Sequence, residues 1–497
     1  MARSEAYEVI VVGGGIGGCF AAATAAANGA EVVQLERKPA DQGGFIACGD
    51  AIKSPTDPKG YPGPIDMAAI TSDEAVLADG NIDKIEWWDE ELGVRKVLPY
   101  ETHSNVIDRY EFGQHLLEQT GELGVTQHFN TVVNGIVQNG QVQGVEAIRD
   151  GESVEYEAEM VIDAAGAQSV IQDMVDFEDL AVEPEPTFEK PHYTHFGSAY
   201  REIIETDEPV EYQNAIVGKP LEEMGYVWYF PRSPTAINVG LGFQMNKEPI
   251  ALADRLREDV EDRPEFDGAS VADRFDKKNK LGAALALRRP LDSMIAPGYI
   301  TVGCAAGTTH PITGKGIRGA AFSGYSAGKT AAGAVADGDV SEQRLWEHNH
   351  YLYVEHGEAA KLAARDAYNV AASSIDIPVL RAVAAILPED EIREIVSTKT
   401  SFDDLASKLS IAAGATKNLV SHYRKGTFEH LGVSKEMLYE ALMGFRTTRE
   451  YVDRYEEHYE NYPASRDGYF EWLAERDRID DEFYDAIDLE PDARKYQ

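Results

Sequence analysis

Residues 7–36 read YEVIVVGGGIGGCFAAATAAANGAEVVQLE. The apolar run Tyr7–Gly13 predicts a buried strand, and the alanine-rich stretch Gly17–Asn28 predicts a helix that ends where glycine follows asparagine. Glu31–Leu35 predicts the next strand. Because a strand, a helix and a second strand in this order form the unit of a parallel sheet, we predict an α/β fold with a Rossmann-type domain.

The turn between the first strand and the helix carries the pattern G-x-G-x-x-G. Gly13 permits the tight turn, Gly15 lets a pyrophosphate approach the backbone, and Gly18 permits close packing of helix on strand. The helix that opens at Gly17 directs free amides at that pyrophosphate. Glu36, 23 residues after Gly13, stands where a carboxylate accepts hydrogen bonds from the adenosine ribose. The pattern predicts a dinucleotide site and leaves FAD and NAD open.

The charge of the chain narrows the range of partners. The sequence has 86 acidic and 46 basic residues, a formal charge of −40. A polyanion of this size repels nucleic acid, so a nucleic-acid partner is disfavoured. The acidic residues are spread along the chain, which is typical of a surface adapted to high salt, and we predict a halophilic protein.

The cysteines and the N-terminus indicate the compartment. Cys19, Cys48 and Cys304 are too few for a disulfide framework and form no CxxC metal pattern, so we predict no metal site. The polar stretch Met1–Glu8 is not a signal peptide, and no apolar run reaches the length of a membrane span. These features predict a cytoplasmic protein and leave contact with the inner face of the membrane open.

Composition and periodicity divide the chain into four parts. The first nucleotide-binding part contains a hairpin around Asn139-Gly140 and a helix expected over residues 105–121. Between the two nucleotide-binding parts we expect an inserted antiparallel sheet domain that binds substrate, and after them a helical, acidic region. The expected parts are residues 1–186, 187–285, 286–340 and 341–497.

Three later segments point to one nucleotide. They are Val161–Ser169 (VIDAAGAQS), Thr301–Gly307 with Gly314–Ile317 (TVGCAAG and GKGI), and Ile107–Phe112 (IDRYEF). Their residues, and their order along the chain, resemble the motifs of the flavoprotein class that includes aromatic hydroxylases and isoprenoid reductases. The resemblance implies that the cofactor is FAD and that Arg109, Asp163, Gly316 and Ile317 belong to its site.

One position departs from that pattern. The class has an aspartate that hydrogen-bonds a ribityl hydroxyl of FAD, whereas this chain has Cys304. A thiol is a poor hydrogen-bond acceptor. We therefore keep Cys304 among the cofactor-binding residues and expect weaker FAD retention than in relatives.

Two further motifs suggest the substrate. Residues 47–51 read ACGDA and residues 225–232 read GYVWYFPR, followed by NVGLG at 238–242. The Cys-Gly pair and the YxWxFP strand resemble the geranylgeranyl reductase family, in the branch that acts on archaeal-type ether lipids. The resemblance implies reduction of isolated C=C bonds of geranylgeranyl chains by hydride from reduced flavin, with Cys48, Gly49 and Ala51 near the isoalloxazine ring.

The residues of these motifs have the chemistry that such a reaction needs. On a strand, Tyr226, Trp228 and Phe230 share one face and could line an apolar tunnel for an isoprenoid lipid. An alkene that accepts a hydride also needs a proton, and Cys48 is our candidate for the proton donor or for a flavin contact.

Several alternatives remain. The same chemistry would reduce the side chain of menaquinone, and the chain could instead be a flavin-binding redox partner or a flavin hydroxylase. An electron-transfer flavoprotein–quinone oxidoreductase is excluded because three scattered cysteines cannot hold a four-cysteine cluster. No second dinucleotide motif is evident, so the electron donor, NADPH or reduced ferredoxin, stays open.

Overall fold

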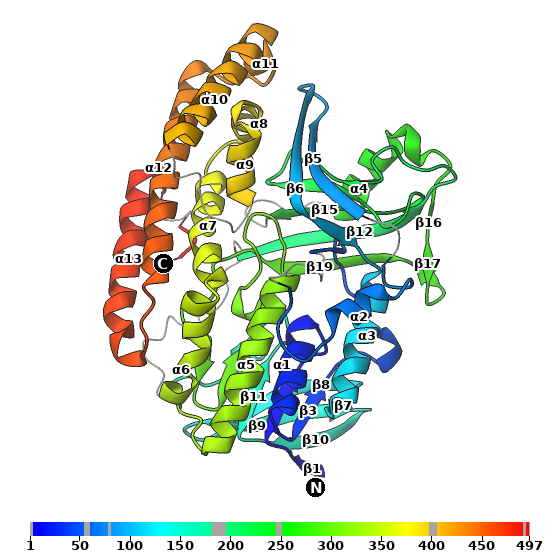
Figure 1. Cartoon of the computed structure of the whole chain (residues 1–497), viewed down its shortest axis with the longest axis vertical. Coiled ribbons are helices and arrows are strands. Elements are labelled where there is room, and N and C mark those ends of the chain that lie inside the picture. The colour runs from blue at the N-terminus through cyan, green and yellow to red at the C-terminus, as the bar shows by residue number, and fades with distance from the viewer. Residues whose placement is uncertain are drawn as a thin grey trace.

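A six-stranded sheet in the order β20-β21-β11-β2-β3-β7 forms the nucleotide-binding layer of the computed structural model (Figure 1). The structure describes residues 3–53, 60–77, 81–180, 195–244, 251–396, 405–490 and 494–496. The pairs within β21-β11-β2-β3-β7 are parallel, and β20 joins antiparallel. The strands are β2 (Val9–Val12), β3 (Val32–Leu35), β7 (Thr126–His128), β11 (Met160–Asp163), β20 (Ile295–Ala296) and β21 (Tyr299–Thr301).

Glycines let the two helices on this sheet touch backbone to backbone. Helix α1 (Ile16–Ala27) packs against α5 (Ile317–Asp337). A Cβ added to Gly324 would lie 2.2 Å from the carbonyl oxygen of Gly17, and one at Gly328 would lie 2.2 Å from that of Ala21. Any larger residue would separate the helices, so these glycines bring the two distant nucleotide-binding segments of the chain together.

The predicted hairpin is confirmed. Strands β8 (Thr131–Gln138) and β9 (Val142–Arg149) pair antiparallel, and Gly140 has the positive φ that a tight turn needs. Two further strands, β10 (Glu152–Glu157) and β1 (Arg3–Ala6), complete a four-stranded sheet.

A nine-stranded sheet forms the second layer, and it takes strands from two regions of the sequence. It contains not only strands from residues 196–286 but also β4, β5 and β6, which precede α3. Strand β6 runs to Val106, so the helix expected over residues 105–121 begins later, at Arg109, where the Asp108 carboxylate accepts the N–H groups of Tyr110 and Glu111. The expected boundary at residues 186 and 187 lies outside the described residues.

The strands of this second sheet are β4 (Ala51–Lys53), β5 (Asn81–Asp89), β6 (Val94–Val106), β12 (Phe196–Glu205), β13 (Ala215–Pro220), β14 (Gly225–Pro231), β15 (Ala236–Gln244), β16 (Ser270–Val271) and β19 (Lys280–Ala286). All pairs are antiparallel except β13 with β5. A two-stranded ribbon, β17 (Asp273–Arg274) and β18 (Lys277–Lys278), and helices α2 (Met67–Ser72), α3 (Arg109–Glu122) and α4 (Leu252–Glu261) complete the first two thirds of the chain.

Helices make up the described part of the C-terminal region. They are α6 (Glu342–His350), α7 (Glu358–Ser373), α8 (Ile377–Ile386), α9 (Glu389–Val396), α10 (Leu405–Lys425), α11 (Thr427–His430), α12 (Lys435–Glu460) and α13 (Tyr469–Ala486), with one π-helical turn over Tyr351–Glu355. Figure 1 shows α12 and α13 as the outer layer of the molecule, outside α7. None of the helices in the described ranges is long and apolar enough to cross a membrane.

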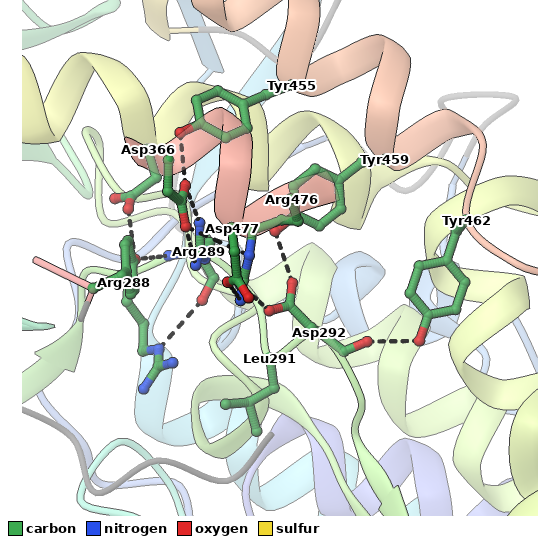
Figure 2. Close-up of polar contacts among 12 residues, drawn as sticks. Arg288, Arg289, Leu291, Asp292, Asp366, Tyr455, Tyr459, Tyr462, Arg476 and Asp477 are labelled. Atoms are coloured by element: carbon green, nitrogen blue, oxygen red, sulfur yellow. Dashed lines mark hydrogen bonds and ion pairs between the residues drawn. The ribbon is translucent and has the colours of Figure 1, made fainter. Parts of the chain in front are cut away.

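A buried network of charges fastens the outer helices to the segment between β19 and β20 (Figure 2). Arg289 donates two hydrogen bonds of 2.9 Å to the Asp480 carboxylate, and Arg476 forms an ion pair with Asp292. The Tyr459 hydroxyl donates to Asp292 at 2.7 Å. Burial alone would raise the pKa of Asp292, but Arg476 and Arg289 hold it below its usual value. The carboxylate is therefore charged inside the core.

The C-terminal residues join the same network. The Lys495 ammonium donates to the Asp366 carboxylate and to the Leu287 carbonyl, both at 2.6 Å, and the Tyr496 hydroxyl donates to Asp366 at 2.5 Å. The end of the chain is thus anchored between α7 and the end of β19.

We predict that Arg476→Leu destabilises the fold strongly, because it leaves the Asp292 carboxylate buried without its cation. Breaking one partner of a buried pair costs about 3–5 kcal/mol. Arg478→Leu on the same helix is the matched control, since Arg478 is 57 % exposed and its loss should leave the melting temperature almost unchanged. Thermal melts of both variants in the same buffer test this, and equal shifts would contradict the role of the network.

Candidate functional site

One large cavity of about 1570 Å³ lies between the two layers and the helical region. It begins at the glycine turn after β2, passes the inner face of the nine-stranded sheet, and ends against the inner face of α12. Most of the predicted site residues line it: Gly13, Gly15, Gly17, Glu36, Cys48, Gly49, Ala51, Arg109, Tyr226, Trp228, Phe230, Cys304, Gly316 and Ile317.

Two predicted residues do not line the cavity. A Cβ at Gly18 would lie 2.0 Å from the carbonyl oxygen of Gly13, so Gly18 only permits the helix to pack on the turn. The Asp163 carboxylate is buried, where it accepts the N–H of Ala165 at 2.9 Å and the hydroxyl of Tyr299 at 2.8 Å. Burial raises the pKa of Asp163 to about 6. Both residues support the turns that line the cavity.

The glycine turn is open toward the cavity. No side chain caps α1 at Gly15, and a Cβ placed there would meet no atom within 4 Å. The Glu36 carboxylate lies beside the turn and accepts the N–H groups of Gly14 and Lys38 at 2.7 and 2.8 Å. An uncapped helix N-terminus with open space in front of it suits a pyrophosphate.

Arg109 supplies a positive charge to this part of the cavity. Its side chain is 1 % exposed, and its Nε and Nη1 atoms have no hydrogen-bond partner within the described chain. Burial lowers the pKa of the guanidinium. Buried donors without partners are rare in native proteins, so the unmet donors of Arg109 fit a bound anionic or polar group such as FAD.

The loop between β21 and α5 forms another wall of the cavity. The Cys304 thiol lies 3.3 Å from the Thr309 hydroxyl, and burial raises its pKa. His310 Nδ1 accepts the N–H groups of Ile312 and Thr313, so the proton of the neutral ring is on Nε2. Burial lowers the pKa of His310 to about 3, which keeps the ring neutral. Helix α5 also begins without a side-chain cap and opens toward the cavity.

The predicted aromatic wall is formed by β14. Trp228 lies flat over Gly240 of the neighbouring strand, where a Cβ would come within 2.3 Å of its ring. Phe230 covers Gly49, and the Tyr226 hydroxyl donates to the Thr313 carbonyl at 2.9 Å. Val227 and Tyr229 point to the opposite face of the sheet and pack into its core, as the alternation along a strand predicts.

A hydrogen-bond network that the sequence analysis missed joins this wall to the Cys48 loop. Asn238 is fully buried; it accepts the indole N–H of Trp228 at 3.0 Å and donates to the Cys48 carbonyl at 2.8 Å and to the Asp50 carboxylate at 2.6 Å. Arg232 Nε donates to the same Asp50 oxygen at 2.9 Å. Although burial alone would lower the pKa of Arg232, the carboxylates of Asp50 and then Asp108 raise it.

The network gives the loop its shape. Asp50 has a φ of +68°, an unusual value for a residue with a side chain, and its N–H lies 3.2 Å from the Cys48 sulfur. Burial, followed by the charge of Asp50, raises the pKa of the Cys48 thiol to about 11. The thiol is therefore protonated at neutral pH and can hold or deliver a proton.

Arg201 is a further site residue that the sequence analysis missed. It is 2 % exposed, lines the cavity from β12, and its Nε atom has no partner in the described part of the chain. Burial lowers its pKa. Its position in a strand, with no motif around it, gave no signal in the sequence.

Comparison with known families agrees with this geometry. The model of FAD dependent oxidoreductases matches residues 8–172, and that of the geranylgeranyl reductase catalytic domain matches residues 196–267, which include the aromatic wall. In these two segments the chain is similar to FAD-dependent oxidoreductases and to the geranylgeranyl reductase family. It is an FAD-dependent oxidoreductase.

Two curated relatives and one solved structure are similar to most or nearly all of the chain. A digeranylgeranylglycerophospholipid reductase from Sulfolobus acidocaldarius is 25% identical over 97% of this chain and 99% of the relative. One from Methanothrix thermoacetophila is 29% identical over 68% of this chain and 81% of the relative. A geranylgeranyl bacteriochlorophyll reductase-like protein from Thermoplasma acidophilum shares the fold, with a TM-score of 0.64, 21% identity, and coverage of 86% and 99% of the two chains.

We predict that Asn238→Leu lowers the melting temperature by several degrees and shifts the visible absorption of bound flavin. The substitution leaves the Trp228 N–H and the Cys48 carbonyl without their partner, and each buried unsatisfied group costs about 1–3 kcal/mol. Trp228→Phe is the control, because it removes one of these bonds and leaves the other two donated by Asn238. A flavin spectrum unchanged in Asn238→Leu would contradict the link between wall and loop.

Proposed function

We propose that this protein is an FAD-dependent reductase that saturates isolated C=C bonds of geranylgeranyl chains in archaeal-type ether lipids. One observation carries the proposal: a single cavity continues from the glycine turn, past the aromatic wall, to the helical region. Its apolar far part suits a long isoprenoid chain. The names of the relatives, digeranylgeranylglycerophospholipid reductases, support this substrate class.

The proposed cofactor-binding residues are those of the two turns, the Cys48 loop and Arg109. Gly15 and the start of α1 would receive the pyrophosphate, Glu36 the ribose, and Arg109 a polar group of the cofactor. When bound, reduced FAD supplies the hydride. The proposed residues are Gly13, Gly15, Gly17, Glu36, Cys48, Gly49, Ala51, Arg109, Cys304, Gly316 and Ile317.

The protein's own groups have three tasks in this proposal. Tyr226, Trp228 and Phe230 hold the alkene in a dry place. The protonated Cys48 thiol delivers the proton to the second carbon, and the Asn238 network fixes the position of that thiol. Because no carbonyl polarises an isolated double bond, positioning and a nearby acid must supply most of the rate.

The electron donor and the location belong to the same proposal. We infer NADPH or reduced ferredoxin as the donor, and action at the inner face of the membrane, where the lipid substrate resides.

In the direct test, the flavin of the purified, FAD-loaded protein is reduced chemically and the protein is incubated with a geranylgeranyl ether lipid. The lipid is then analysed by mass spectrometry. We expect a mass gain of two hydrogens for each double bond reduced. Parallel reactions with menaquinone test the alternative. If only the quinone side chain is reduced, the protein is a quinone side-chain reductase and the lipid proposal fails. If neither substrate is reduced, both proposals fail.

Cys48→Ala should lower alkene reduction about 100-fold or more while FAD stays bound, because general acid catalysis contributes about that factor. The raised pKa gives the sign of the pH effect: the thiol keeps its proton below about pH 11, so turnover falls only as the pH approaches that value. Cys19→Ala is the matched control, since Cys19 is fully buried in α1, outside the cavity. Turnover of Cys48→Ala equal to that of the control would remove Cys48 from the mechanism.

A further inference from the structure

Large side chains are exposed on the C-terminal half of α10 and on α12. Tyr423 is 58 % and Val420 43 % exposed on α10, and Tyr439 is 65 % and Met443 42 % exposed on α12. The Lys435 ammonium lies 5.1 Å from the ring centre of Tyr423, which joins the two helices. We call these five residues the α10–α12 surface.

The charge around this surface is opposite in sign to that of the chain. Residues 414–446 contain five lysines and arginines and three glutamates, whereas the whole sequence has 46 basic and 86 acidic residues. Each of the five basic side chains is exposed. They are Lys417, Arg424, Lys425, Lys435 and Arg446, and the acidic ones are Glu429, Glu436 and Glu440.

The helical periodicity of α12 places one tyrosine between two basic side chains on its exposed side. Lys435, Tyr439 and Arg446 are spaced by four and seven residues and share one stripe of α12, from which Lys435 reaches Tyr423 of α10. Glu436 and Glu440 lie on the adjacent stripe of the same exposed side, next to Met443. Lys435 and Arg446 therefore flank Tyr439 on α12, and Lys435 also lies against Tyr423 of α10.

The opposite side of the same helix lines the cavity. Ala441, Phe445 and Thr448 of α12 form part of its wall. Figure 1 shows α10 and α11 at the end of the molecule that lies opposite the N-terminus. The surface is thus one helix thickness away from the apolar end of the cavity.

We propose that the α10–α12 surface docks on an anionic lipid bilayer. Tyrosine rings favour the boundary between water and lipid, methionine and valine side chains enter the acyl region, and lysine and arginine are attracted to anionic headgroups. This combination matches a bilayer, whereas the rest of this polyanionic chain is repelled by it. The inference rests on the proposed function in one respect, that the substrate is a membrane lipid.

The test is co-sedimentation of the FAD-loaded protein with vesicles of phosphatidylcholine, alone or mixed equally with phosphatidylglycerol. It is done at the lowest KCl concentration at which the protein keeps its flavin. We expect binding to the anionic vesicles at least about tenfold tighter than to the neutral ones, since each basic residue near an anionic surface contributes appreciably.

Two double variants separate the contribution of the lysines to vesicle binding from that of the tyrosines. Lys425→Glu with Lys435→Glu should abolish the preference for anionic vesicles, and Tyr423→Ser with Tyr439→Ser should weaken binding to both kinds. The matched control is Arg257→Glu with Phe470→Ser, which changes exposed residues outside the surface and should bind like the unaltered chain. Equal binding of all variants, or no binding by the unaltered chain, overturns the proposal.

Two further readouts keep the interpretation clear. If sedimentation velocity shows a dimer that only the tyrosine variant dissociates, the surface is an interface between copies and the proposal fails. Alkene reduction is measured on detergent-dispersed lipid with each variant and should be unchanged. If the protein binds vesicles normally but reduces no alkene, the result counts against the proposed function alone. If it reduces the alkene normally but does not bind vesicles, the result counts against the α10–α12 surface alone.

Discussion

The Asp50 carboxylate holds three segments of the chain together at the centre of the cavity. It accepts hydrogen bonds from Arg232 and Asn238, and Arg232 also reaches Asp108, which caps the helix that begins with Arg109. A buried carboxylate is tolerated only when such partners compensate its lost hydration. The same contacts therefore stabilise the Cys48 loop and fix its position between the aromatic wall and the glycine turn.

A second set of buried ion pairs gives the cavity its far wall. Helices α7 and α8, which line this end, pack against α12, and α12 packs against α13. The ion pairs of Arg289 with Asp480 and of Arg476 with Asp292 hold α13 in place. The chain thus pairs acidic residues with arginines in its core. Exposed basic residues surround the α10–α12 surface, although the whole chain is acidic, which is why we assign this surface a distinct role.

Local patterns predicted the elements whose signals are contiguous in sequence. The strand, helix and strand of residues 7–36, the hairpin around Gly140 and the alternation along β14 are all found, because each is determined by neighbouring residues. Strands β4 to β6 were not predicted as part of the second sheet, because strand pairing over a long sequence separation leaves no local signal. The four-part division of the chain and the halophilic surface stay predictions.

The sequence by itself determined the nucleotide turn, the FAD-type motifs and the family resemblance, since these depend on glycine spacing and residue types that need no partner to be recognised. Tertiary structure alone decided which predicted residues face the cavity: it turned Asp163 and Gly18 into supports of the turns and brought in Asn238, Arg232 and Arg201. The reason is that a side chain's role at a site depends on which distant groups satisfy its hydrogen bonds and charge once it is buried. That pairing exists only after the two sheets and the helical region have packed.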